Sequence, residues 1–190
     1  MNIPNTISLA RLFAVPVIVW LILQQHLVPA FWLSLVAALS DAVDGIVAKH
    51  FQSETVLGGY LDPIADKTLL VCGYVTLGHE GYLPVWLVIM VVFRDALIIG
   101  GALLFQTITS TLNMQPLLIS KVNTFCQLVM AVGVLGVAGF AVEDHGLSEL
   151  MAYIVGTTTL ASGGAYVVLW TRRAGQIVDS RMDMSREEGD

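Results

Sequence analysis

Six long apolar stretches, separated by short polar segments, follow one another along the chain. They lie at Ile7–Leu23, Phe31–Ala48, Pro63–Leu77, Pro84–Phe105, Leu117–Val142 and Leu150–Trp170. A helix needs about 20 predominantly apolar residues to cross the hydrocarbon core of a bilayer. The pattern therefore predicts an all-α fold, a polytopic membrane bundle of about six transmembrane helices. We expect one transmembrane domain at 1–173 and a polar tail at 174–190.

Composition and charge support this prediction and suggest an orientation. Hydrophobic residues make up 56% of the chain and charged residues 13%, whereas soluble domains carry about 25% charged residues. Segments 24–30, 78–83 and 143–149, which would lie on one side of a membrane, contain no lysine or arginine. Basic loops stay on the cytoplasmic side, so both termini and the polar tail should be cytoplasmic. No basic stripe suggests a nucleic-acid partner.

Four aspartates stand at corresponding places on two neighbouring apolar stretches. Asp41 and Asp44 are three residues apart near the end of the second stretch, and Asp62 and Asp66 are four apart near the start of the third. Residues at either spacing share one face of a helix. A loop of about a dozen residues would make the two helices antiparallel neighbours, so we expect the four carboxylates to converge near the cytoplasmic boundary.

Such a cluster of carboxylates needs compensating charge. Each ionised group inside a membrane span costs about 2.5–3.5 kcal/mol on insertion scales, and like charges at close range add to this. Ligation by oxygen alone suits Mg²⁺, Mn²⁺ or Ca²⁺ better than zinc. Two such ions could also bind a diphosphate and stabilise a leaving phosphate. Lys49 and Lys67 flank the aspartates and could hold further phosphate charge.

Simpler interpretations exist for each part of the constellation. Asp62 precedes Pro63, the pattern of a helix N-cap followed by proline at the first helical position. Asp41 and Asp44 alone could belong to a cation transporter, although transporter sites usually lie near the midplane of repeated, broken helices. A catalytically silent membrane scaffold would not require the acidic set. The joint spacing is more specific than any single part.

This spacing resembles the motif of the CDP-alcohol phosphatidyltransferases, D-x2-D-G-x2-A-R-x8-G-x3-D-x3-D. The matching positions are Asp41, Asp44, Gly45, Ala48, Gly58, Asp62 and Asp66. Lys49 stands where the family usually has arginine, which keeps the charge but loses the bidentate fork. The opening segment Ile3-Pro4-Asn5-Thr6 with Leu9-Ala10-Arg11 is also similar to that of the family, so the resemblance covers most of the chain before the tail.

The resemblance implies a role for each matching residue. Asp41, Asp44, Asp62 and Asp66 would bind two divalent cations, Mg²⁺ or Mn²⁺, and Asp66 would also be the general base for the acceptor hydroxyl. The nucleotide of CDP-diacylglycerol would be bound by Asp44, Gly45, Ala48, Lys49 and Gly58. The family is commonly dimeric, so a homodimer surrounded by membrane lipid is expected. The expected location is the bacterial or mitochondrial inner membrane, with the active site facing the cytoplasm or matrix.

The acceptor alcohol is less clearly indicated. Arg94 and Asp95 lie near the middle of the fourth apolar stretch, where they could serve function or form a structural ion pair within the bundle. Lys121 lies at the start of the fifth stretch. Lys67, Arg94 and Lys121 are therefore candidate acceptor-binding residues.

Two acceptors fit these segments. The run Ser120-Lys121-Val122-Asn123-Thr124, together with Arg94-Asp95, resembles the CMP-forming cardiolipin synthases, which use phosphatidylglycerol. The alternative is a phosphatidylglycerophosphate synthase, which uses glycerol 3-phosphate and tends to have Arg-Glu in place of Arg94-Asp95. The sequence favours phosphatidylglycerol.

Overall fold

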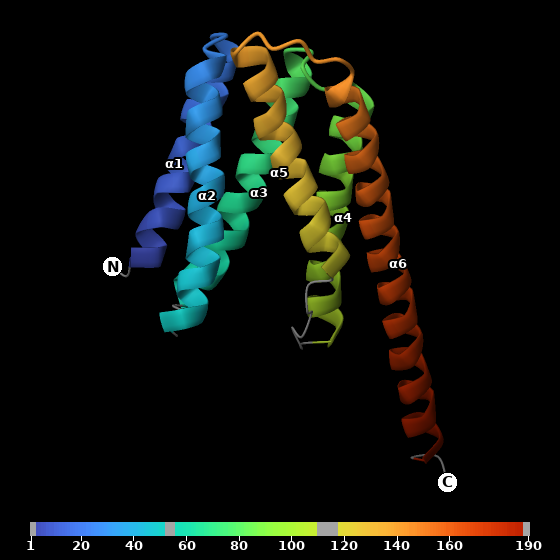
Figure 1. Ribbon diagram of the computed structural model, residues 1–190. Helices are drawn as coiled ribbons and strands as arrows, with labels where there is room; N and C mark the ends of the chain where they lie inside the picture. Colours follow the sequence, from blue (N-terminus) through green and yellow to red (C-terminus); the bar gives the residue numbers. More distant parts are fainter. Residues whose placement is uncertain (1–2, 52–55, 110–117, 188–190) are drawn as a thin grey trace.

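Six α-helices form the part of the chain that the computed structural model describes, which comprises residues 3–51, 56–109 and 118–187 (Figure 1). Side chains are described for 9–40, 67–101 and 118–172. The helices are α1 (Ile3–Leu23), α2 (Leu27–Phe51), α3 (Val56–His79), α4 (Val85–Thr109), α5 (Leu118–Gly139) and α6 (Leu147–Glu187). These residues contain no strand, so the predicted all-α class is confirmed.

Each predicted apolar stretch falls mainly within one helix, but two helices extend well beyond their stretch. Helix α3 begins at Val56, so Asp62 and Pro63 lie inside the helix and the predicted N-cap at Asp62 is wrong. Helix α6 continues through the polar tail to Glu187. Hydrophobicity marks only the part of a helix that lies in an apolar environment, and the polar ends carry a weaker signal.

The helices alternate in direction along the chain. The short connections α1–α2, α3–α4 and α5–α6 lie at one end of the bundle, here called the loop end, and the two termini lie toward the other, the termini end (Figure 1). Both termini therefore lie on the same side of the bundle. The six-span count and the side of the membrane on which the termini lie stay predictions.

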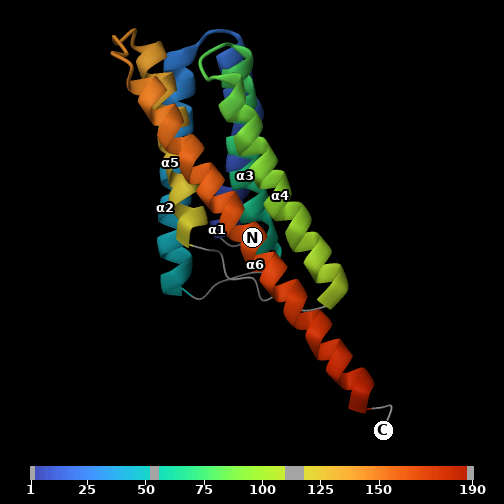
Figure 2. The ribbon, with the colours of Figure 1, turned by 90° about the vertical axis from the view of Figure 1, so that its right-hand side faces the viewer.

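Packing joins the helices around an apolar core. Helix α1 packs against α2 and α3, α5 packs against α2 and α6, and α4 packs against α6 and α3 (Figures 1 and 2). The largest buried apolar side chains include Ile22, Tyr74, Leu87, Val91 and Met130. Burial of each such side chain stabilises a fold by about 1.5–3 kcal/mol in water, and close packing supplies the attraction where lipid replaces water.

Small residues allow close helix contacts at several points. A Cβ atom on Gly101 would lie 1.9 Å from the ring of Trp170, so a larger residue on α4 there would force the indole ring of α6 to move. Helix α5 also approaches α2 closely at Gly136 and Gly139, where a Cβ would lie 3.1 Å from atoms of α2. Gly133 has no such atom within 4 Å.

The outer surface of the bundle is apolar. Large hydrophobic side chains that are more than half exposed occur on every helix for which such side chains are described except α3; examples are Phe13, Trp20, Trp32, Phe93, Phe125 and Leu160. Two helical segments, Leu118–Gly139 and Leu147–Arg172, are long and apolar enough to cross a membrane among the residues searched. Apolar segments of this length also occur in soluble cores, but those of a soluble core are not exposed in this way.

Candidate functional site

The four aspartates of the acidic motif lie on two helices whose neighbouring ends are close in sequence. Asp41 and Asp44 are on α2, and Asp62 and Asp66 are on α3. Only residues 52–55 separate the end of α2 from the start of α3. Five extended residue steps span at most about 17 Å, which limits the distance between the two helix ends. The aspartate side chains lie outside the described residues, so their predicted convergence stays a prediction.

Helix geometry nevertheless fixes the height of each aspartate backbone along its helix. Asp44 is seven residues before the end of α2, and Asp62 is six residues after the start of α3. At about 1.5 Å per residue both are about 10 Å from the junction. Asp41 and Asp66 are each ten residues from it, or about 15 Å. Because the two helices run in opposite directions (Figure 1), the motif places its acids in two matched tiers.

The donor set fits divalent cations bound by oxygen. The four aspartates of the motif would supply the hard oxygen ligands that Mg²⁺ and Mn²⁺ prefer. The described side chains themselves contain no group of three His, Cys, Asp or Glu residues that could hold a metal. The expected nucleotide-binding residues Gly45, Ala48 and Lys49 lie on α2, and Gly58 lies on α3; their contacts also fall outside the description.

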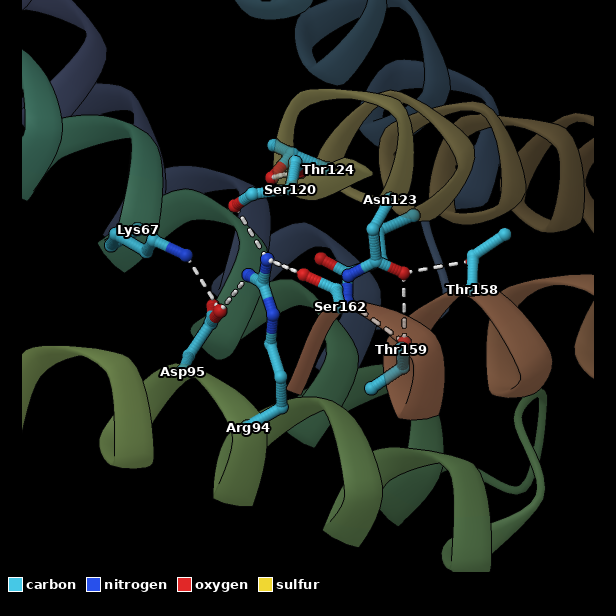
Figure 3. A network of polar contacts seen from close by, with 10 residues as sticks. Lys67, Arg94, Asp95, Ser120, Asn123, Thr124, Thr158, Thr159 and Ser162 are labelled. Carbon is cyan, nitrogen blue, oxygen red and sulfur yellow. Dashed lines mark hydrogen bonds and ion pairs between the residues drawn. The ribbon is translucent and has the colours of Figure 1, made fainter. Parts of the chain in front are cut away.

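A network of polar side chains begins directly beside the acidic motif. The Lys67 ammonium and the Arg94 guanidinium both donate to Oδ1 of Asp95, each at 2.6 Å (Figure 3). Lys67 follows Asp66 on α3, whereas Arg94 and Asp95 are on α4. The structural alternative predicted for Arg94 and Asp95, an ion pair within the bundle, is thus confirmed. The predicted acceptor contacts stay predictions.

Arg94 connects three helices. Its Nη2 donates to the hydroxyl of Ser120 on α5 and to that of Ser162 on α6, both at 2.6 Å. The residue is only 3% exposed, so its guanidinium is enclosed by protein groups. Its planar, multiply donating shape suits this role better than a lysine ammonium would.

A second set of hydrogen bonds continues the network toward the loop end. Asn123 accepts from Thr158 at 2.8 Å and from Thr159 at 2.9 Å through its Oδ1 atom (Figure 3). The Tyr74 hydroxyl donates to the Gln127 backbone carbonyl at 2.9 Å. These bonds connect α5 to α6 and α3, which fixes the helices that surround the ion pair.

Because this network is buried, each of its charged and polar groups needs a partner to avoid a large cost in folding free energy. Asp95 is 2% exposed and Asn123 is fully buried. Removing one partner from a buried ion pair typically costs about 3–5 kcal/mol, because it leaves an uncompensated charge. Four buried polar atoms of the network have no hydrogen-bond partner among the described residues: Nε of Arg94, Oδ2 of Asp95, Nδ2 of Asn123 and Oε1 of Gln127. Such groups usually bind ordered water or a ligand, so these four atoms are available to bind water or a polar ligand inside the bundle.

The structure brings some of the predicted acceptor residues together. Lys67 and Arg94, both predicted near the acceptor, meet on Asp95. Lys121 is exposed near the start of α5, and it forms no ion pair with the described side chains. Sequence reasoning missed Ser162, Thr158 and Thr159 of α6. Polar side chains inside a predicted span tend to face the bundle interior, and that signal could have identified them.

Comparisons with known proteins cover nearly all of these residues. The sequence profile of a family described as CDP-alcohol phosphatidyltransferase matches residues 1–170. The match includes the acidic motif and the whole network around Asp95.

Individual relatives carry two different names. A chloroplastic CDP-diacylglycerol–glycerol-3-phosphate 3-phosphatidyltransferase from Oryza sativa is 33% identical over 87% of this chain and 56% of its own length. A CMP-forming cardiolipin synthase from Rattus norvegicus is 31% identical over 87% of this chain and 60% of its own length. A CDP-diacylglycerol–glycerol-3-phosphate 3-phosphatidyltransferase from Aquifex aeolicus is 32% identical over 72% of this chain and 78% of its own length. The chain thus spans less than two thirds of the first two relatives.

Proposed function

Because the chain belongs to the CDP-alcohol phosphatidyltransferase family, we propose that it is an integral membrane enzyme that transfers a phosphatidyl group from CDP-diacylglycerol to an alcohol. The observation that carries this proposal is the profile match over 1–170, within which all four aspartates keep the family spacing. Fold alone would not support a reaction, but a set of four aspartates at the family spacing does.

The membrane location is supported by the apolar outer surface and by the polar groups that the bundle buries beside its apolar core. Exposed positions such as Phe13, Phe93 and Leu160 are apolar, while buried positions such as Arg94 and Asn123 are polar. A bilayer favours this arrangement, because polar groups that face lipid cannot find partners. We place both termini and the acidic motif on the cytoplasmic or matrix side, because 24–26, 80–84 and 140–146 at the loop end contain no lysine or arginine.

The acidic motif would hold two divalent cations. In this proposal Asp41, Asp44, Asp62 and Asp66 supply the oxygen ligands. The ions, when bound, would neutralise the diphosphate of the donor and the charge that develops on the leaving phosphate. Gly45, Ala48 and Gly58 leave space for the nucleotide to lie against the helix backbones, and Lys49 adds positive charge beside it.

The transfer is a substitution at phosphorus. Asp66 accepts the proton of the acceptor hydroxyl as its oxygen attacks the β-phosphorus of CDP-diacylglycerol. A new phosphorus–oxygen bond forms, the bond between this phosphorus and CMP breaks, and CMP leaves with the bonding electron pair. Positioning of the two reactants and electrostatic stabilisation would supply most of the rate.

We propose phosphatidylglycerol as the acceptor, which would make cardiolipin the product. Arg94 followed by Asp95, rather than by glutamate, supports this choice, as does the polar run that starts at Ser120. Glycerol 3-phosphate is the alternative, and relatives of both names match the chain to a similar extent. Both acceptors carry a phosphate group, for which Lys67 and Lys121 are the proposed contacts.

Separate acceptor assays test the proposal. Purified protein in detergent receives labelled CDP-diacylglycerol and Mg²⁺ with phosphatidylglycerol in one reaction and glycerol 3-phosphate in the other. We expect CMP release and labelled cardiolipin in the first. Labelled phosphatidylglycerophosphate in the second alone would reassign the acceptor. Absence of CMP release with both acceptors, together with divalent-ion flux through reconstituted liposomes, would replace the transferase by a cation transporter.

A further inference from the structure

The carboxylate of Asp95 holds two cations of very different accessibility. Its Oδ1 atom accepts from Lys67 and from Arg94, both at 2.6 Å. The side chain of Lys67 is 26% exposed, whereas those of Asp95 and Arg94 are each 3% exposed. Asp95 is therefore fixed inside the bundle, and Lys67 reaches it from the edge.

Arg94 holds the same carboxylate oxygen of Asp95 that Lys67 binds. Its guanidinium is bound to hydroxyls of α5 and α6 as well as to Asp95 (Figure 3). With three helices holding this arginine, Asp95 has little freedom to follow Lys67 if the lysine moves. The geometry makes Asp95 the fixed partner and Lys67 the adjustable one.

Lysine needs such a partner at this position. Its ammonium ends a flexible four-carbon chain and acts as a point charge without a preferred orientation. Asp66 directly precedes Lys67 in the sequence, so Lys67 lies at the edge of the acidic motif. The bond to Asp95 uses one of three ammonium donors, which leaves donors for an anionic ligand. When two divalent cations offset the four carboxylates of the acidic motif, the net charge of about +1 on Lys67, Arg94 and Asp95 remains to attract an anion.

We propose that Asp95 is a positioning residue that holds the Lys67 ammonium where it binds the phosphate group of the acceptor. Arg94 then serves as the anchor of Asp95 rather than as an acceptor ligand. This inference rests on the proposed function, because it assumes an acceptor that carries a phosphate. The phosphate of phosphatidylglycerol and that of glycerol 3-phosphate are equivalent for this purpose.

A double-mutant cycle tests whether Asp95 acts through Lys67. Michaelis constants for the acceptor and for CDP-diacylglycerol are measured separately for the wild type, Asp95→Asn, Lys67→Met and the double variant, each with the acceptor that the wild type uses. We expect Asp95→Asn to raise the acceptor KM about tenfold and to change the donor KM less than about twofold. In the Lys67→Met background the same substitution should change the acceptor KM less than about twofold.

Two further variants separate positioning from structural support. Asp95→Glu keeps the charge but displaces the carboxylate. As a single substitution it should raise the acceptor KM by about threefold, and in the Lys67→Met background it should leave the acceptor KM unchanged. This variant also serves if Asp95→Asn does not fold. The control is Thr76→Val, which removes a hydrogen bond to the Cys72 carbonyl near the loop end of α3 without touching Lys67 or the polar network. It should lower Tm by about 2–4 °C with both KM values unchanged.

The outcomes are distinguishable. Additive effects of Asp95→Asn and Lys67→Met on the acceptor KM, or equal rises in both KM values, would overturn the positioning role while the transferase function stood. A lower Tm in Asp95→Asn with an unchanged acceptor KM would mean that Asp95 is only a structural ion-pair partner. A wild type that releases no CMP with either acceptor would refute the proposed function itself, and this inference with it.

Discussion

The interior of the bundle differs sharply between its loop end and its middle. Near the loop end most buried side chains are apolar, as at Leu77, Leu83, Leu87 and Leu135. Further toward the termini end the same helices bury the ion pair of Arg94 and Asp95 together with serine, threonine and amide groups.

The two regions of the bundle have different roles. An apolar core tolerates substitutions of similar volume, because its contacts have no strict direction. A buried polar network tolerates few, because each donor needs its acceptor at a fixed place. The polar interior lies next to the acidic motif, because Lys67 of the network directly follows Asp66 of the motif in the sequence. We interpret the loop end as the packed base of the molecule and the polar interior as the support of the reaction site.

The largest effect should come from the acidic motif itself. Asp66→Asn removes the proposed base and one metal-ligand charge, so CMP formation should fall about 10⁴-fold or more. The rate of CMP release from CDP-diacylglycerol measures this. Glu143→Gln removes an exposed carboxylate at the loop end and should leave the rate unchanged. Comparable rates in the two variants would remove Asp66 from its role.

The next largest effect is expected in the polar interior, where a substitution should lower the free energy of unfolding. Arg94→Met leaves Asp95 without its enclosed partner, so the free energy of unfolding should fall by about 3–5 kcal/mol. Thermal or denaturant unfolding in detergent measures the change. An unfolding free energy within about 1 kcal/mol of the wild type would mean that the network contributes little, and the contrast between the two interiors would lose its energetic basis.

The apolar core should respond differently. Leu87 is fully buried, and Leu87→Ala should lower the free energy of unfolding by about 2–4 kcal/mol through lost contacts and a cavity. The variant that still folds should keep its KM for both substrates. A selective rise in the acceptor KM of Leu87→Ala would show that the loop end also shapes the acceptor site. The two regions would then not have separate roles.

The smallest effect belongs to the outer surface. Leu160 on α6 is 67% exposed, so Leu160→Ala should change the free energy of unfolding by less than about 0.5 kcal/mol. A parallel measurement with Leu87→Ala provides the buried comparison. A loss above about 2 kcal/mol at Leu160 would indicate that another chain covers this face, as the expected homodimer allows.

The sequence predicted the helices well because each apolar stretch is long enough to define one. It failed at the polar ends of the helices. Asp62 and Pro63 formed a convincing start signal, but α3 already begins at Val56. A proline inside a helix disrupts a single hydrogen bond locally, and neighbouring helices can compensate for this loss in a bundle.

The candidate site was predictable only in part for a similar reason. The spacing of the aspartates is a local property of the chain, so the motif could be read directly. The bond of Lys67 to Asp95 joins residues 28 positions apart, and the bond of Arg94 to Ser162 joins residues 68 apart. Such partners depend on how the helices are rotated against one another, which periodicity alone does not determine.

The proposed reaction depends on carboxylates of α2 and α3 that gather around divalent cations. Anomalous X-ray scattering at the manganese edge, from crystals of the full chain grown with Mn²⁺, would locate such ions. We expect two peaks between Asp41 and Asp44 on one helix and Asp62 and Asp66 on the other. Carboxylates that point away from one another, with no manganese between them, would rule this metal site out.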